Sequence, residues 1–242
     1  DKYAFVPTHK LLDIFRDAGY YPIMASESKA REENQGYQKH IILFRSLENL
    51  LRPNAKDEYE DIVLTNSHNR TSSFIVDLAI FRIVCSNMLV VPSKSFVHAS
   101  IVHVGFTNEK VKNAIAEVTS YMPKIKEIVA TFKSIHLTPS EEQMLANAAI
   151  DIRFDTNTHY IKADELLKVN YEEDYVPTLW SAYNRIQEAM IRGGVKMKNL
   201  ITNKTFTSKA INGIDATIKF NKELFEAVEQ VALLKSNHNL AA

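Results

Sequence analysis

Two apolar runs, 61–65 and 74–79, are separated by only eight polar residues, NSHNRTSS. Both runs are rich in β-branched residues, which favour strands. Two strands joined by so short a polar connection are typical of a β-hairpin, so this stretch predicts an antiparallel pair in the first half of the chain. Asp-Gly at such a tip is a strong signal for a tight type I′ turn, but this chain has Asn69-Arg70, which favours a longer or different turn.

The remaining patterns predict strands early in the chain and helices late. Thr8 can cap a helix over 7–18, and Gly19 would end it. Further strands are expected over 20–28, 36–46 and 95–105. Residues 80–92 form a mostly apolar run that fits either a strand or a short buried helix. Helices are expected over 107–122, 123–135, 138–153, 177–192 and 221–234. This order indicates an α+β fold. Residues 1–105 are expected to form an antiparallel β-sheet in the N-terminal half, packed with helices including one at the N-terminus. Residues 106–242 are expected to form a mainly helical C-terminal half with a basic loop, and the two parts are expected to belong to one continuous domain.

Local signals define several helix boundaries in the second half. Thr138 and Glu141 form a capping-box pattern, and Asn221 is expected to cap the last helix. Trp180 and Tyr183 are expected to anchor the core. Residues 155–175 are polar and acidic and are expected to be irregular, and residues 195–209 show no strong period.

Composition narrows the class of protein. Apolar residues make up 45% of the 242 residues and charged residues 24%, which is typical of a soluble globular protein. The most apolar run carries Asp77 and Arg82, so no membrane helix is expected. A single cysteine, Cys85, excludes an internal disulfide and agrees with a reducing bacterial cytoplasm.

Charge is balanced overall but is unevenly distributed. Formal net charge is zero, yet residues 141–174 carry nine acids against three bases, and 185–222 carry eight bases against two acids. Residues 189–213 contain no acid. Cations, hydroxyls and amides of this kind contact phosphates, and an aromatic ring can stack on a base. The candidate nucleic-acid-binding residues here are Arg192, Lys196, Lys198, Lys204, Phe206 and Lys209. The alternative is a basic loop that pairs with the chain's own acidic segment.

The hairpin tip offers a second candidate anion site. Arg70, with Ser72, Ser73 and backbone N–H groups, could face phosphate oxygens. The alternative is a solvated turn whose polar side chains bond the local backbone. No glycine-rich phosphate loop accompanies it.

Catalytic and metal-binding patterns are weak. No nucleophile motif accompanies His68, and His98 and His103 would point to opposite faces of a strand. We therefore expect no catalytic residues, no bound metal and no cofactor.

Several segments resemble a known family in order and spacing. They include YAFVPTHKLLDIFRDAGYYPIMASESKAR, KHIILFR, IVLTNSH, FRIVCSNMLVV and RIQEAMIRGG. Together they resemble domain of unknown function 932, a family found in phages, prophages and plasmids. The resemblance spans nearly the whole chain and implies a product of a mobile genetic element with no established activity.

Three functions follow as hypotheses. The first is a nucleic-acid-binding protein without a catalytic centre, which would bind DNA, single-stranded DNA in preference, or anneal it during recombination as a homo-oligomer. The second is a protein-interaction factor that antagonises a host defence system, with the acidic segment 155–174 mimicking a nucleic-acid backbone. The third is a metal-dependent nuclease built from acidic residues and His159.

Overall fold

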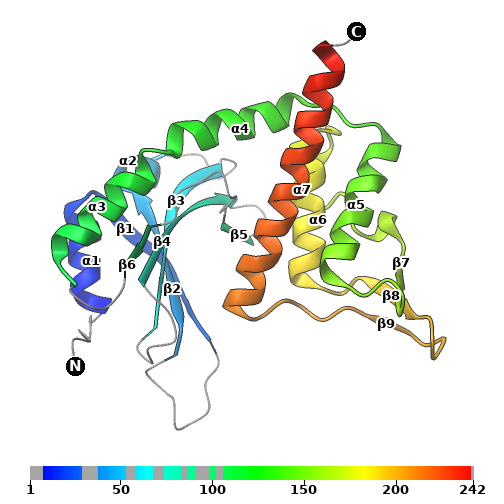
Figure 1. Cartoon of the computed structure of the whole chain (residues 1–242), viewed down its shortest axis with the longest axis horizontal. Coiled ribbons are helices and arrows are strands. Elements are labelled where there is room, and N and C mark those ends of the chain that lie inside the picture. The colour runs from blue at the N-terminus through cyan, green and yellow to red at the C-terminus, as the bar shows by residue number, and fades with distance from the viewer. Residues whose placement is uncertain are drawn as a thin grey trace. The chain divides into compact units, whose positions relative to one another are not determined.

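The computed structural model describes residues 8–28, 38–52, 58–67, 74–82, 87–90, 99–101 and 106–240. The chain divides into two compact units, residues 1–125 and 126–242. The first holds a six-stranded sheet and the second a set of helices with a small three-stranded sheet, so the α+β prediction is confirmed (Figure 1). The division lies within helix α4 (Met122–Ser134).

The sheet of the first unit is antiparallel throughout. Its strands run in the order β1-β2-β3-β4-β5, and β6 also pairs with β4. The predicted hairpin is confirmed, because β3 and β4 are antiparallel with Thr65 opposite Ile75, while its tip, 68–73, lies outside the described residues. The elements of this unit are α1 (Thr8–Asp17), β1 (Tyr20–Glu27), β2 (His40–Ser46), α2 (Leu47–Leu50), β3 (Glu58–Asn66), β4 (Phe74–Arg82), β5 (Asn87–Val90), β6 (Ala99–Ile101) and α3 (Asn108–Thr119).

Apolar packing explains why the first helix forms where the sequence predicted it. Leu11, Ile14 and Phe15 recur at helical spacing and are buried. The Phe15 ring stacks on Phe44 of β2, with ring centroids 4.0 Å apart. Helix α3 packs against β4 and β6. One face of the sheet is thereby covered by helices.

A buried ion pair lies on the sheet face opposite to Phe44. Arg45 Nε donates to Asp61 Oδ1 at 2.9 Å, and Arg45 Nη2 donates to Oδ2 at 2.7 Å. The Asp61 side chain is fully buried and that of Arg45 is 8% exposed. The guanidinium carbon of Arg45 also lies 4.0 Å from the centre of the Tyr59 ring. Burial raises the pKa of Asp61 to about 6, although the hydrogen bond and charge of Arg45 lower it.

The second unit is built on three long helices together with the C-terminal part of α4. Thr138 and Glu141 form the predicted capping box of α5, and α6 buries Trp180 and Tyr183 as expected. Its elements are α5 (Pro139–Arg153), β7 (His159–Ile161), the short 3₁₀ helices η2 (Ala163–Glu165) and η3 (Glu172–Asp174), α6 (Leu179–Arg192), β8 (Lys196–Asn199), β9 (Thr205–Thr207) and α7 (Ile214–Leu240).

One expectation for this unit was wrong. Asn221 does not cap the last helix: α7 begins at Ile214, and Asn221 is fully buried within it, where its Oδ1 accepts a hydrogen bond from Gln187 Nε2 of α6 at 3.1 Å. Residues 214–220 contain no glycine or proline, and Ile214 and Phe220 are buried, so helical packing extends upstream. Residues 155–175 are irregular as expected apart from the three-residue β7, η2 and η3, and residues 195–209, whose sequence shows no strong period, contain the short strands β8 and β9.

The two glycines after α6 allow a prediction with a built-in control. Gly193 has φ +73°, and a Cβ there would lie 2.6 Å from the backbone N of Ala210 and 2.6 Å from the carbonyl C of Lys209. Gly194 has φ +79° but open space around it. We expect Gly194→Ala to lower the unfolding free energy by about 1 kcal/mol through backbone strain alone, and Gly193→Ala by about 3 kcal/mol, because a clash with backbone is added.

Urea denaturation of both variants, followed by circular dichroism, measures the difference. Equal destabilisation by the two substitutions would contradict the close approach of 209–210 to Gly193.

Candidate functional site

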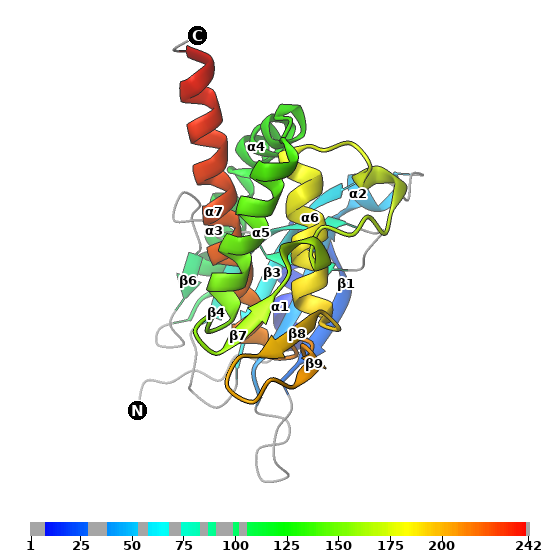
Figure 2. The ribbon, with the colours of Figure 1, turned by 90° about the vertical axis from the view of Figure 1, so that its right-hand side faces the viewer.

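The small sheet of the second unit brings together two segments that are far apart in the sequence. Its order is β7-β8-β9, all antiparallel. In both views the three strands lie beyond the ends of α5 and α6 (Figures 1 and 2). Since α5 leads into β7 and α6 into β8, these are the C-terminal ends of the helices.

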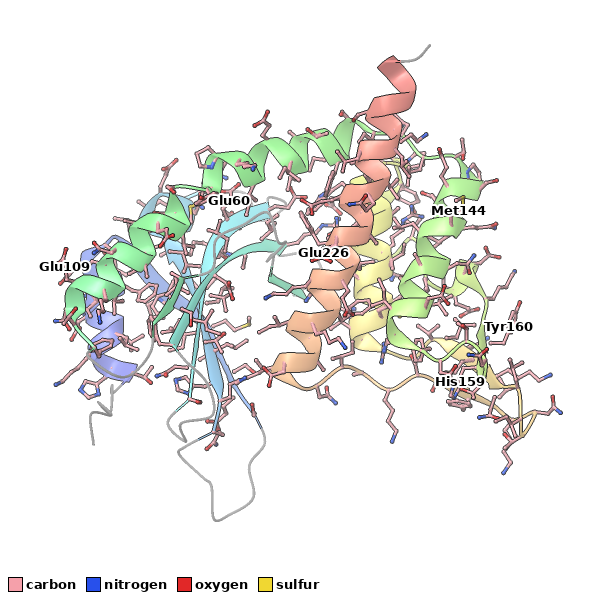
Figure 3. All side chains as sticks on the ribbon, viewed as in Figure 1. Glu60, Glu109, Met144, His159, Tyr160 and Glu226 are labelled. Carbon is pink, nitrogen blue, oxygen red and sulfur yellow. The ribbon has the colours of Figure 1, made fainter. Side chains whose placement is uncertain are left out.

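One face of this sheet carries lysines and an aromatic ring. Tyr160 lies opposite Lys198 on the neighbouring strand, and Lys198 lies opposite Thr205. Lys196 and Thr207 are also paired and share this face, because side chains alternate along a strand. All five side chains are exposed, Tyr160 by 58%. We call Tyr160, Lys196, Lys198, Thr205 and Thr207 the lysine face; Tyr160 and its neighbour His159 are labelled in Figure 3.

The other face of the sheet is partly buried: Phe206 on it is 42% exposed, whereas two aliphatic side chains are covered. Ile161 and Met197 are paired and buried. Phe206 is the cross-strand partner of Met197, and its ring meets the edge of the His159 ring at a centroid distance of 5.9 Å. Phe206 therefore lies on the opposite face from Lys196 and Lys198, although the sequence analysis placed it in one group with them.

The turn between β8 and β9 is held by one side chain. Asn199 Oδ1 accepts hydrogen bonds from the backbone N–H groups of Ile201, at 3.0 Å, and Thr202, at 2.8 Å, and from the Thr202 hydroxyl at 3.1 Å. The Asn199 N–H donates to the carbonyl of Lys204 at 2.9 Å. Asn203 takes a φ of 58°, a left-handed conformation that asparagine tolerates.

Arg153 joins this sheet to the helices. It donates hydrogen bonds to the carbonyl of Met190, in the last turn of α6, and to the carbonyl of Lys209, just after β9. The Met190 carbonyl is one of those that a helix leaves unpaired at its C-terminal end. Burial lowers the pKa of Arg153. Because an arginine guanidinium stays charged even so, its bond to Met190 places positive charge at the end of α6 where the helix dipole is negative.

The predicted cations differ in how far the protein itself neutralises them. Arg192 forms an ion pair with the buried Glu188 at 2.8 Å, and Glu188 also accepts a hydrogen bond from Tyr171 at 3.0 Å. The pKa of Glu165 is lowered first by its hydrogen bond from Lys168 and, among smaller causes, by the charge of Lys196. Arg192 is thus compensated within the chain, and Lys196 in part.

The remaining three cations are exposed. Lys198, Lys204 and Lys209 form no ion pair with any residue that the structure describes. Lys198 lies on the lysine face, Lys204 at the end of the β8–β9 turn and Lys209 two residues beyond β9. These are the charges best placed to meet a polyanion.

The candidate residues of the first unit fall elsewhere. Arg70, Ser72 and Ser73 lie outside the described residues, so the anion site at the hairpin tip stays a prediction.

The acidic segment mostly pairs with its own neighbours. Asp155 accepts hydrogen bonds from Asn157 and Thr158, and Asp164 pairs with Lys162 at 2.6 Å. Asp174 is buried. Within the part of the chain that the structure describes, no three histidine, cysteine or acidic side chains gather closely enough to bind a metal ion.

Tyr160 is the site residue that the sequence analysis missed. The triplet His159-Tyr160-Ile161 has the aromatic and β-branched character of a strand, but three residues are too few for an alternating pattern to show. Only the pairing with Lys198 reveals that the ring belongs with the basic segment.

The geometry first defines a class: an α+β protein whose small second sheet presents a basic, solvent-exposed face. The chain belongs to the family described as "Domain of unknown function (DUF932)", whose family model matches residues 1–225. The resemblance noted from the sequence is thereby confirmed.

Two relatives come from Escherichia coli strain K12. The UPF0380 proteins YfjQ and YafZ are each 30% identical to this chain over 230 residues, which is 95% of this chain and 82% of each relative. No solved structure matches the chain. Among the described residues, no helix combines the length and apolar character that a bilayer crossing requires.

Proposed function

We propose that the second unit binds single-stranded nucleic acid, DNA in preference, through the lysine face, and that it does so without a catalytic centre. The observation that carries the proposal is the exposed Tyr160 ring directly beside Lys198 on a sheet whose exposed strand positions include no acid. Binding as a homo-oligomer, annealing of strands, recombination and an origin in a mobile genetic element are parts of the proposal that rest on the sequence analysis alone.

Charge supports a polyphosphate as the ligand. Lys198, Lys204 and Lys209 are exposed and without an ion pair among the described residues, and no acid occurs between 189 and 213. Each lysine that neutralises a phosphate releases a condensed counterion, which favours binding regardless of the nucleotide sequence. The hydroxyls of Thr205 and Thr207 add hydrogen-bond donors to phosphate oxygens.

The aromatic ring favours a single strand over a duplex. A side chain can stack only on a base whose face is open, and in a duplex neighbouring bases occupy that position. Tyr160 projects from a sheet, and a sheet surface that combines basic residues with a ring is a common platform for unpaired bases. Specific readout of base edges is not expected, because the face carries no amide or acidic side chain.

The two other hypotheses receive less support. A mimic of a nucleic-acid backbone needs open carboxylates, but those of Asp155, Asp164 and Glu165 already accept hydrogen bonds from neighbouring residues. A nuclease needs clustered metal ligands, which the described residues do not provide.

The salt dependence of binding tests the proposal. We expect the full chain to bind a labelled single strand, and the logarithm of its affinity to fall linearly with the logarithm of salt concentration. Lys198→Ala should reduce that slope by about 0.7, and the triple replacement of Lys196, Lys198 and Lys204 by alanine should reduce it by about 2, because each phosphate contact on a single strand contributes about 0.7. Fluorescence anisotropy at several salt concentrations measures both.

Lys219→Ala is the matched control. Lys219 is exposed on α7 and pairs with Glu223 at 3.8 Å, so its loss should leave the slope unchanged. Absence of binding at low salt, or a slope that the triple replacement does not alter, would refute the proposal.

A further inference from the structure

The turn of the β8–β9 hairpin exposes two adjacent aliphatic side chains. Ile201 is 74% exposed and Leu200 is 46% exposed. Isolated apolar residues are ordinary on a protein surface, but two in succession at the end of a hairpin form a small apolar tip that water solvates poorly. A tip of this kind gains when another molecule covers it.

The backbone that carries this tip is fixed before any partner arrives. Asn199 Oδ1 bonds the N–H groups of Ile201 and Thr202, and the Leu200 N–H donates to the carbonyl of Thr158 at 2.8 Å, just before β7. Hydrogen bonds thus connect the tip to the end of β8 and to the start of β7. Little ordering is required on binding, which favours insertion over a loose hydrophobic contact.

The charges around the tip indicate what covers it. Lys198 precedes Leu200 by two residues and Lys204 closes the turn, and both are exposed without an ion pair among the described residues. Apolar side chains flanked by cations fit stacked bases, which are flat and apolar, between phosphates, which are anionic.

We propose that Leu200 and Ile201 form a wedge that enters the base stack where a single strand joins a duplex. The inference rests on the proposed function. The lysine face would hold the single-stranded part of the DNA, and the wedge would meet the first base pair of the adjoining duplex. The wedge would unstack the terminal pair of the duplex, as apolar side chains do when they enter between base steps.

A forked DNA tests the wedge. It carries a single-stranded tail and a 2-aminopurine in the first base pair of the duplex; this base fluoresces more when it is unstacked. We expect the full chain to bind the fork at least about threefold more tightly than a single strand of the tail's sequence, and to raise the fluorescence. The double variant Leu200→Ser with Ile201→Ser should lose both effects and keep its affinity for the single strand within about twofold, because the lysine face is intact.

Met144→Ser is the matched control, since Met144 is 70% exposed on α5 (Figure 3) and is not part of the hairpin. It should behave as the unmodified chain. Leu200 and Ile201 lie in an exposed turn that is stabilised by Asn199, so their replacement should leave the fold intact. Circular dichroism checks that the double variant stays folded.

The outcomes separate this inference from the proposed function. Binding of the single strand with no preference for the fork, or a preference that the double variant retains, would refute the wedge and leave the lysine face in place. No binding to either DNA would refute both. Sedimentation with phosphatidylserine vesicles that the double variant abolishes would also overturn the wedge, because the tip would then insert into a lipid surface.

Discussion

Asp61→Ala is expected to lower the free energy of unfolding by about 3–5 kcal/mol, the usual cost of leaving a buried charge without its partner. Arg45, whose side chain is 8% exposed, would lose two hydrogen bonds to a carboxylate, and its contact with the Tyr59 ring is weaker than that ion pair. Urea denaturation at pH 8 measures the loss; Asp61, with a pKa raised to about 6, is ionised there.

A double replacement is the control for this prediction. Arg45→Met together with Asp61→Leu removes both charges and retains most of the volume, so it should cost less than Asp61→Ala alone. A loss below about 1 kcal/mol for Asp61→Ala would mean that the guanidinium is hydrated and that the pair is not buried as the structure has it.

Tyr160→Ala is expected to weaken binding of a single strand by roughly 5- to 150-fold, which corresponds to the loss of about 1–3 kcal/mol for one stacked base. Tyr160→Phe should keep most of the affinity, because stacking requires the ring and not the hydroxyl. The ring is 58% exposed, so the stability of the fold should change by less than about 0.5 kcal/mol. Anisotropy titrations and urea denaturation on the same preparations separate the two effects.

Tyr175→Ala controls for the loss of any exposed tyrosine. Tyr175 follows η3, is 71% exposed and belongs to none of the three strands of the sheet, so its removal should not affect binding. Equal losses from both tyrosines, or no loss from Tyr160→Ala, would remove the ring from the site.

The parts of the fold that were predictable are those with strong local signals. The capping box at Thr138, the apolar spacing of α1 and the polar connection between β3 and β4 each act within a few residues, so the sequence shows them directly. The α+β order follows from them, because long periodic segments come late and β-branched segments come early.

The parts that were not predictable depend on pairing between distant residues. Asn221 carries the chemistry of a helix cap, but packing of 214–220 extends the helix and turns its side chain toward Gln187. The strands β7, β8 and β9 have three or four residues each, too few for alternation to identify them.

The same limit applies to the candidate site. The exposed lysines were visible as an acid-free run, but a linear sequence does not show on which side of a sheet each residue lies. Phe206 was grouped with Lys198 because it is near in sequence, whereas Tyr160 is near in space. Arg192 was counted among the open cations because its partner, Glu188, is a turn away on the same helix and its burial is a tertiary property.

The topology of the small sheet has a consequence for how this unit folds. The β8–β9 hairpin closes over five residues, whereas Ile161 of β7 must find Met197, thirty-six positions later, with all of α6 in between. Because contacts between distant residues cost more chain entropy to close, we expect the hairpin to form early and β7 to add late. A chain caught between these steps would have its lysines in register but no tyrosine beside them, so the complete face would exist only once α6 is in place.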